Sequence, residues 1–444
     1  MVTRLARREA RRHKPAMSSP TFPSFIVLGA GASGLMAARD LARAGRRVTV
    51  LEARDRCGGR IYPLPDSALG MAAEGGAEFV HGAAPLTRAM AGEAGLTLVP
   101  LTGQGWTKRN GALTRSGDDT PHAEELQQAL ASLDADLPIA EFLDTRFAGE
   151  TYATMRRSII RMTEGYDAAD PARASTFALR EEWLGEGIDE QHRIGEGYGA
   201  LIDHLARDVR DHGGAIRLGT RATAIESAGG RLVARTEGGA DFIADAVVLA
   251  VPLPLLRAIA LPPSLNSKLA AIAEIGFGNV VKLLLRFRSR WWTGHNGGQL
   301  ARMSFVFAET RIPTWWTQYP REDALLTGWY AGPKADGVEN LSDAQWTGMA
   351  LASLAGIFDI SVERLNDELA GARVFNWSAD PLARGAYSYA TPKTRAAQAA
   401  LLAPDGTGIY FAGEALYPGR DMGTVEAALA AGREAARQAL AEIG

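Results

Sequence analysis

The stretch from Ser24 to Glu52 constrains the fold more strongly than any other part of the sequence. An apolar, β-branched run over 24–28 predicts a buried parallel strand, and small residues at helical spacing then continue to Gly45. A second strand-like run over 47–51 ends in an acid. Strand, glycine-rich turn, helix, strand and acid in this order predict a βαβ unit that binds a dinucleotide.

The glycine-rich turn between the first strand and the helix predicts a phosphate-binding site. Gly29 permits the tight turn, Gly31 lets a pyrophosphate approach the backbone, and Gly34 lets the helix pack close to the sheet. Ser33 stands at the helix N-terminus, whose free N–H groups favour anions. Glu52 can accept hydrogen bonds from both ribose hydroxyls and would repel a 2′-phosphate, so the predicted ligand is FAD or NAD(H) rather than NADP(H).

A second loop, rich in glycine and arginine, follows Glu52 and separates FAD from NAD(H). It contains Arg54, Gly59 and Arg60, and arginine forks suit the pyrophosphate of an extended cofactor. The segment resembles the flavin amine oxidases, a family that includes monoamine oxidases, polyamine oxidases, the oxidase core of lysine-specific histone demethylases and L-amino-acid oxidases. The resemblance runs through nearly the whole chain after about Pro23 and implies FAD as the cofactor.

The resemblance also implies an α/β fold of two domains. One is a Rossmann-like FAD-binding domain of the p-hydroxybenzoate-hydroxylase-like (GR2) type, and the other is an α+β substrate-binding domain on a mixed or antiparallel sheet. The FAD-binding domain is expected to combine residues 23–82, 196–258 and 400–444, and the substrate-binding domain 83–195 and 259–399. Helical periodicity predicts that 83 to about 200 is mainly helical, with Glu182 and Trp183 as helix surface and core.

The segment around Gly76 is dense in small residues, which allows the backbone to lie flat against a planar ligand. By resemblance, Gly76, Ala77 and Glu78 lie beside the isoalloxazine ring of FAD. Amino-acid oxidases carry a carboxylate-binding arginine shortly after the Gly-Ala pair, but here no arginine follows until Arg88. His81 stands where polyamine oxidases carry an acid or histidine, so we expect it to face the substrate amine; the alternative is a hydrogen-bonded loop histidine.

Lys282 stands among apolar residues of a predicted strand, where a lysine is rare without a function. In the family the matching lysine holds a water against flavin N5; the alternative is a lysine that snorkels at a strand end. Trp377 and Tyr387 keep the family's spacing, with the tryptophan beside the flavin and the tyrosine as one wall of an aromatic cage. Ala386 replaces the cysteine that binds FAD covalently in monoamine oxidases, so non-covalent FAD is expected.

The resemblance completes the predicted site near the C-terminus. It assigns the adenine to Ala222, the ribityl–phosphate region to Gly413 and Glu414, and the flavin carbonyl edge to Thr424 and Val425. Many monoamine oxidases carry a second cage tyrosine where Thr424 stands, so that wall is expected to be missing unless Tyr417 or another aromatic replaces it. The predicted catalytic residues are Lys282, Tyr387, His81 and Trp377.

Composition limits the other partners. A formal net charge of −3 gives no reason to expect nucleic acid or a membrane, and no apolar run is long enough to span a bilayer. Cys57 is the one cysteine and no HExxH motif occurs, so no metal is expected. We expect a cytoplasmic monomer or homodimer, with a disordered basic tail at 1–22 in which Met17 is a second candidate start.

The sequence shows one dinucleotide fingerprint, so the electrons are expected to come from the substrate and to pass to oxygen. The resemblance implies hydride transfer from the carbon next to a neutral amine nitrogen to flavin N5. Water then hydrolyses the imine to an aldehyde or ketone, and oxygen becomes hydrogen peroxide. A polyamine or primary amine is the expected substrate. The alternatives are an L-amino-acid oxidase, a desaturase of the same fold, and a catalytically quiet FAD-bound interaction protein.

Overall fold

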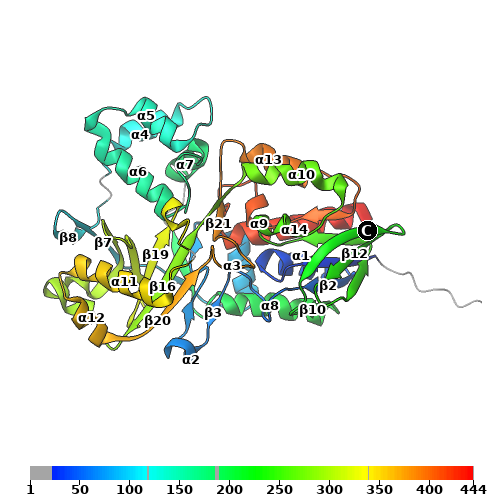
Figure 1. Cartoon of the computed structure of the whole chain (residues 1–444), viewed down its shortest axis with the longest axis horizontal. Helices are drawn as coiled ribbons and strands as arrows, with labels where there is room; N and C mark the ends of the chain where they lie inside the picture. Colours follow the sequence, from blue (N-terminus) through cyan, green and yellow to red (C-terminus); the bar gives the residue numbers. More distant parts are fainter. Residues whose placement is uncertain (1–22, 118–119, 186–189, 339, 444) are drawn as a thin grey trace, which may run out of the picture.

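A five-stranded parallel sheet forms the centre of one half of the molecule (Figure 1). The computed structural model describes residues 23–117, 120–185, 190–338 and 340–443, so the predicted tail at 1–22 lies outside the described residues. The strands, in sheet order, are β10 (Ala215–Arg217), β2 (Arg47–Leu51), β1 (Ser24–Leu28), β14 (Ala246–Leu249) and β22 (Ile409–Phe411). The central position of β1 agrees with its uninterrupted apolar sequence.

Side chains of β1 alternate between two hydrophobic cores, one on each face of the sheet. Phe25 and Val27 pack against a helical layer, whereas Ile26 and Leu28 face a small antiparallel sheet. The helices are α1 (Ala32–Arg43), α3 (Pro85–Glu93), α8 (Tyr198–Asp211) and α14 (Val425–Ile443). The small sheet contains β11 (Ala222–Ala228), β12 (Arg231–Thr236) and β13 (Asp241–Ala244). The α/β architecture predicted for the nucleotide-binding part is therefore confirmed.

A seven-stranded mixed sheet forms the second half of the molecule (Figure 1). Its order is β20 (Leu369–Asn376), β16 (Val280–Phe287), β19 (Leu325–Ala331), β18 (Thr314–Thr317), β17 (Met303–Ala308), β7 (Gln104–Arg109) and β8 (Ala112–Arg115). Only the β7–β17 pair is parallel. Helices α11 (Asp343–Phe358) and α12 (Val362–Glu368) pack on it in a tryptophan-rich core.

Strands β7 and β8 lie in the region for which helical periodicity predicted mainly helix. Their sequence lacks a continuous apolar face, since β8 is the edge strand of the sheet and β7 is the strand next to it. The helices of the same region are α4 (Ala123–Ala131), α5 (Ile139–Arg146), α6 (Ala153–Gly165) and α7 (Thr176–Leu184). They share a core of their own and form the lobe at the top left of Figure 1.

Short elements connect these layers and bring loops toward the centre of the molecule. The small sheets contain β3 (Pro63–Leu64), β4 (Ala73–Glu74), β5 (Val80–His81), β6 (Leu98–Pro100), β9 (Gln191–Ile194), β15 (Gly276–Gly278) and β21 (Tyr387–Tyr389). The short helices are α2 (Asp66–Leu69), α9 (Leu253–Leu256), α10 (Asn266–Ala271) and α13 (Thr394–Leu402). The exact division of the chain into two domains stays a prediction.

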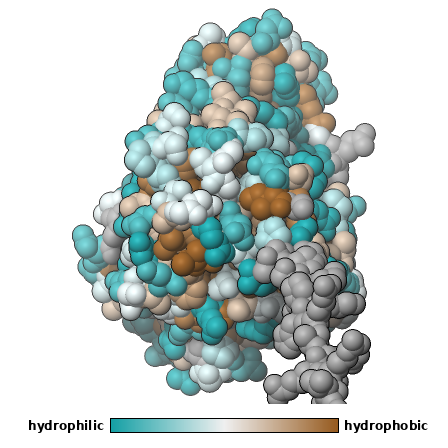
Figure 2. All heavy atoms as spheres, turned by 90° about the vertical axis from the view of Figure 1, so that its right-hand side faces the viewer, coloured by the Kyte–Doolittle hydropathy of each residue, from teal (hydrophilic) through white to brown (hydrophobic). Residues whose placement is uncertain are grey.

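The end of the molecule viewed in Figure 2 carries small hydrophobic groups separated by hydrophilic and intermediate residues. Such scattered apolar side chains are normal for a protein surface. Within the described ranges, no helix combines the length and the apolar character needed to cross a lipid bilayer.

Candidate active site

One long cavity of about 1900 Å³ joins the N-terminus of α1 to the mixed sheet and the helical lobe. Almost all residues predicted from the sequence line it. They are Gly29, Gly31, Ser33, Glu52, Arg54, Gly59, Arg60, Gly76, Ala77, Glu78, His81, Ala222, Lys282, Trp377, Tyr387, Gly413, Glu414, Thr424 and Val425. Gly34 serves packing instead, because a Cβ there would lie 1.9 Å from the carbonyl oxygen of Gly29. The structure therefore brings the predicted residues together in one cavity, although the role of each stays a prediction.

The nucleotide end of the cavity is held in a single geometry by Glu52. Its carboxylate is buried and accepts hydrogen bonds from the backbone N–H of Ala30 at 2.7 Å and of Arg54 at 2.8 Å. Gly29 has a φ of +101°, and a Cβ there would lie 2.8 Å from the carbonyl oxygen of Ala250. The turn thus requires glycine, and Glu52 joins it to the loop that contains Arg54.

Unpaired donors at this end fit a phosphate-bearing cofactor. The buried hydroxyl of Ser33 has no hydrogen-bond partner among the described residues and lines the cavity. The first turn of α1 contains no acid, and its N-cap Gly31 provides no side-chain cap. The N-terminal N–H groups therefore remain available to a pyrophosphate, for which Ser33 and Arg54 stay predicted contacts, while Glu52 stays the predicted partner of the ribose.

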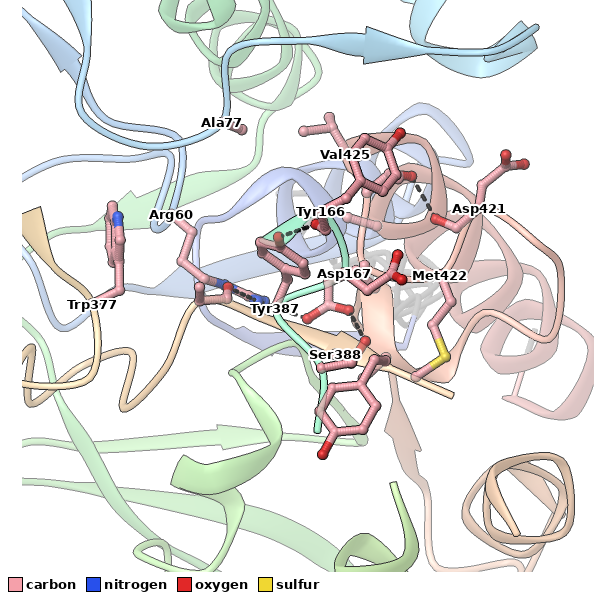
Figure 3. A pocket seen from close by; sticks show the side chains of 18 of the residues that line it. Arg60, Ala77, Tyr166, Asp167, Trp377, Tyr387, Ser388, Asp421, Met422 and Val425 are labelled. Carbon is pink, nitrogen blue, oxygen red and sulfur yellow. Dashed lines mark hydrogen bonds and ion pairs between the residues drawn. The ribbon is translucent and has the colours of Figure 1, made fainter. Parts of the chain in front are cut away.

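Loops from three parts of the chain meet where the flavin ring is expected (Figure 3). Arg60 donates to the carbonyl oxygen of Ala386 and to Oε1 of Glu414, both at 2.7 Å. Ser388 donates to the other oxygen of Glu414, so this buried carboxylate ties β21 to the loop that contains Arg60. Trp377 donates from Nε1 to the carbonyl oxygen of Gly75 at 3.2 Å, which fixes the indole against the Gly76–Ala77 backbone.

The N-terminus of α14 reaches the same end of the cavity. Thr424 caps the helix, since its hydroxyl oxygen accepts the N–H of Ala427 at 3.2 Å and donates to the carbonyl oxygen of Asp421 at 2.6 Å. Gly423 has a φ of +86° and packs closely on β21. The positive end of the helix dipole near Val425 therefore faces the expected flavin edge.

Lys282 and Glu78 form a buried ion pair in the cavity wall. Lys282 is 1% exposed, and its Nζ donates to Oε2 of Glu78 at 2.8 Å and to the carbonyl oxygen of Gly76 at 3.0 Å. Burial raises the pKa of Glu78, but the opposing charges of Lys282 and Arg193 outweigh it and hold the pKa at about 2. The snorkelling alternative is wrong, because Lys282 lies inside the sheet with its ammonium buried.

Aromatic side chains surround the other walls. The hydroxyl of Tyr387 donates to the carbonyl oxygen of Tyr166 at 2.6 Å, and Trp329 lies nearly parallel to Tyr387 with ring centroids 6.4 Å apart. Nδ1 of His81 lies 3.1 Å from the hydroxyl of Tyr166. Burial lowers the pKa of His81 to about 4, so its imidazole is neutral at neutral pH. Trp329 supplies an aromatic ring beside Tyr387. The position of Thr424, where a second cage tyrosine was expected to be missing, has no aromatic ring.

Two acids in the cavity were not predicted as site residues. Asp167 follows α6 and Glu182 lies on α7, and both line the cavity. Burial, reinforced by the charge of Glu182, raises the pKa of Asp167 well above its usual range, and burial raises the pKa of Glu182 to about 7. The prediction of Glu182 as helix surface is wrong, because α7 turns that side inward. Helical periodicity could not identify Glu182 as a site residue, because a polar residue that faces a cavity and one that faces solvent look alike in sequence.

The chain has an α/β fold of the dinucleotide-binding type. Small residues leave room for a planar ligand next to a buried lysine, and this combination defines a class of flavin-dependent oxidoreductases. The model of the flavin containing amine oxidoreductases matches residues 32–440, and the chain belongs to this family. FAD is its cofactor, as the resemblance implied.

Individual relatives agree with this assignment. The chain is 29% identical to a probable polyamine oxidase 4 of Arabidopsis thaliana, over 83% of this chain and 77% of the relative. It is 25% identical to lysine-specific histone demethylase 2 of Homo sapiens, over 88% of this chain and 50% of the relative. Putrescine oxidase bound to putrescine has the same fold, with a TM-score of 0.78, 21% identity and coverage of 94% and 99%. A cyclohexylamine oxidase from Brevibacterium oxydans also scores 0.78, at 21% identity and coverage of 95% and 99%.

Proposed function

We propose that the chain oxidises a diamine or polyamine at a carbon next to an amine nitrogen, with oxygen as the final acceptor. Amine, oxygen and water give an aldehyde, a smaller amine or ammonia, and hydrogen peroxide. Bound FAD supplies the acceptor for the two electrons. The observation that carries the proposal is the pair of unpartnered acids, Asp167 and Glu182, in the same cavity as Lys282 and Tyr387.

The acids favour a substrate with more than one amine. Across the described ranges, neither Asp167 nor Glu182 has an ion pair or a hydrogen bond to its side chain. Both carboxylates are half-buried. A half-buried carboxylate without a cation is costly, and a second ammonium on the substrate would reduce that cost. The polyamine oxidases among the relatives and the putrescine bound in a protein of the same fold support this choice.

The chain's own residues orient the reacting nitrogen and exclude water. The hydrogen bond from Tyr387 to Tyr166 fixes the tyrosine ring, whose face can receive an amine together with Trp329. His81 is neutral, so it adds no positive charge that would repel an ammonium and can accept a hydrogen bond from an amine. A deprotonated reacting nitrogen then needs no strong base in the protein.

The cofactor is proposed to be bound without a covalent link. Ala386 offers only a methyl group at the position of the family's attaching cysteine. Cys57 lies in the loop that approaches Gly31 at the nucleotide end, and burial raises the pKa of its thiol. Acid precipitation should therefore leave yellow FAD in the supernatant, and a yellow pellet would contradict non-covalent binding.

Anaerobic bleaching of the holoenzyme tests the proposed function. Spermidine, putrescine, an aromatic monoamine and an L-amino acid are each mixed with the protein before air is admitted and peroxide is assayed. Bleaching by the di- or polyamine, followed by peroxide, is expected. Bleaching by the amino acid alone would favour an amino-acid oxidase, although Arg88 donates to the carbonyl oxygen of Ala83 and does not line the cavity. No bleaching by any compound would favour a binding role.

A further inference from the structure

We propose that Glu78 is a positioning residue for Lys282, whose ammonium it holds at one point of the cavity wall beside the bound FAD. The family resemblance placed Glu78 at the cofactor, but its carboxylate is directed to protein groups. Glu78 would in this way set the surroundings of the bound FAD, whichever amine is oxidised.

The carboxylate of Glu78 is saturated by side chains from the mixed sheet and from β9. Oε2 accepts from Lys282 at 2.8 Å and from Trp316 at 3.1 Å. Oε1 accepts from Arg193 at 3.0 Å, from Trp316 at 3.1 Å and from Gln318 at 3.1 Å. With this many donors, the carboxylate has one orientation and no free lone pair for the cofactor.

Lys282 depends on Glu78 for the position of its charged end. Its backbone in β16 is fixed by pairing with Trp329 and Phe375, but four rotatable bonds separate the backbone from Nζ. Glu78 and the carbonyl oxygen of Gly76 take two of the three N–H groups, and the Trp316 ring lies 5.4 Å from Nζ. One N–H group then remains for a molecule in the cavity that Lys282 lines.

The competing explanation is that Glu78 serves only to neutralise Arg193. Arg193 is held independently of Glu78, since it also donates to the carbonyl oxygens of Thr317 at 2.9 Å and Tyr319 at 3.1 Å. Of the remaining charged neighbours, Glu74 has a pKa raised to about 7 by burial and Arg321 pairs with Asp323. Glu78 is thus the carboxylate that contacts Lys282 directly, at the point where its charge faces the cavity.

The test is the midpoint potential of the bound FAD, measured by dye equilibration during enzymatic reduction without any amine. Two-electron reduction adds negative charge to the cofactor, and a fixed neighbouring cation stabilises it. Glu78→Asp keeps the charge but shortens the side chain, so the potential should move toward the lower value of Lys282→Met. Glu78→Gln removes the anion and should move the potential in the opposite, more positive direction.

The decisive comparison places Glu78→Asp in the Lys282→Met background. If Glu78 acts through Lys282, the double variant has the potential of Lys282→Met alone. The same shift in both backgrounds, or a wild-type potential in Glu78→Asp, would overturn the proposal. Should Glu78→Asp fail to retain FAD, an unchanged potential in Glu78→Gln would overturn it as well.

A matched control removes a different carboxylate from a buried ion pair. Asp208 on α8 binds Nε of Arg39 at 2.5 Å and does not line the cavity. Asp208→Asn is expected to lower the melting temperature while the FAD potential stays at the wild-type value. Because no amine enters this experiment, its failure is separate from failure of the proposed polyamine oxidation.

Discussion

The two acidic regions of the cavity differ in what the protein provides for them. Glu78 is surrounded by donors, and its pKa is held at about 2 against the effect of burial. Asp167 and Glu182 are supplied with no cation by the described chain, and burial raises the pKa of Glu182 to about 7. The first region has its charge fixed by the fold, whereas the second is proposed to be completed by an ammonium group of the substrate. Within the cavity, a saturated polar group belongs to the architecture of the fold, whereas an unsaturated one is a candidate contact for a ligand.

The largest effect is expected when the fixed region is broken. Lys282→Met removes the cation that faces the cavity and should lower kcat/KM by about 100-fold or more, the scale of a positioned proton-handling or polar group. Peroxide production from the best amine of the bleaching panel measures this. Lys393→Met, at a side chain 72% exposed, should keep wild-type activity. Full activity in Lys282→Met would remove Lys282 from the catalytic residues.

The unsaturated region should control substrate choice. The double variant Asp167→Asn, Glu182→Gln is expected to raise KM for a di- or polyamine about 10- to 100-fold, the equivalent of one or two charged hydrogen bonds. KM for an aromatic monoamine should change little, because it has no second ammonium. Glu363→Gln on the exposed side of α12 is the matched control. An equal loss for both substrates would contradict a role in recognising the second amine.

The raised pKa of Glu182 should give polyamine affinity and folding stability opposite pH dependences. As pH rises through about 7, Glu182 loses its proton, so KM for a polyamine should fall by about tenfold relative to that for a monoamine. Folding stability should move the other way and decline from pH 4.5 to about 7, because the native state holds a proton that the unfolded state has released. Glu182→Gln should remove the part of both trends that is due to Glu182, and the double variant with Asp167→Asn should remove the rest.

The smallest effect is expected at the nucleotide end. Ser33→Ala removes a buried hydroxyl that has no hydrogen-bond partner among the described residues. The change should weaken FAD binding about three- to tenfold, as measured by equilibrium titration of the apoprotein. Thr327→Val deletes another buried hydroxyl without a described partner, but one outside the cavity wall. It should leave FAD affinity unchanged. Equal effects of the two changes would show that Ser33 only contributes to packing.

Local patterns predicted the cofactor end of the molecule well. β1 was expected at 24–28 and forms at Ser24–Leu28, because a strand, its turn and the following helix are contiguous in sequence. Lys282 was recognised in the same way, as a charge inside an apolar strand. The resemblance then added the loops that meet around Arg60.

Part of the substrate end was not predicted, because it forms only through tertiary contacts. Arg193 and Trp316 reach Glu78 from distant strands, and neither has a sequence neighbour that indicates this role. Asp167 lies in the loop that follows α6 and Glu182 lies on α7, and only the packing of the helical lobe places both at the cavity. Position relative to a cavity is not encoded in local periodicity.

The order of strands in the parallel sheet has a consequence for synthesis of the protein. β1 at Ser24–Leu28 and β22 at Ile409–Phe411 belong to the same sheet, and α14 packs directly on α1. β22 and α14 must therefore have left the ribosome before this sheet can close and FAD can be enclosed. Until then the edge of β14 that pairs with β22 stays open, and an unpaired strand edge is prone to aggregation.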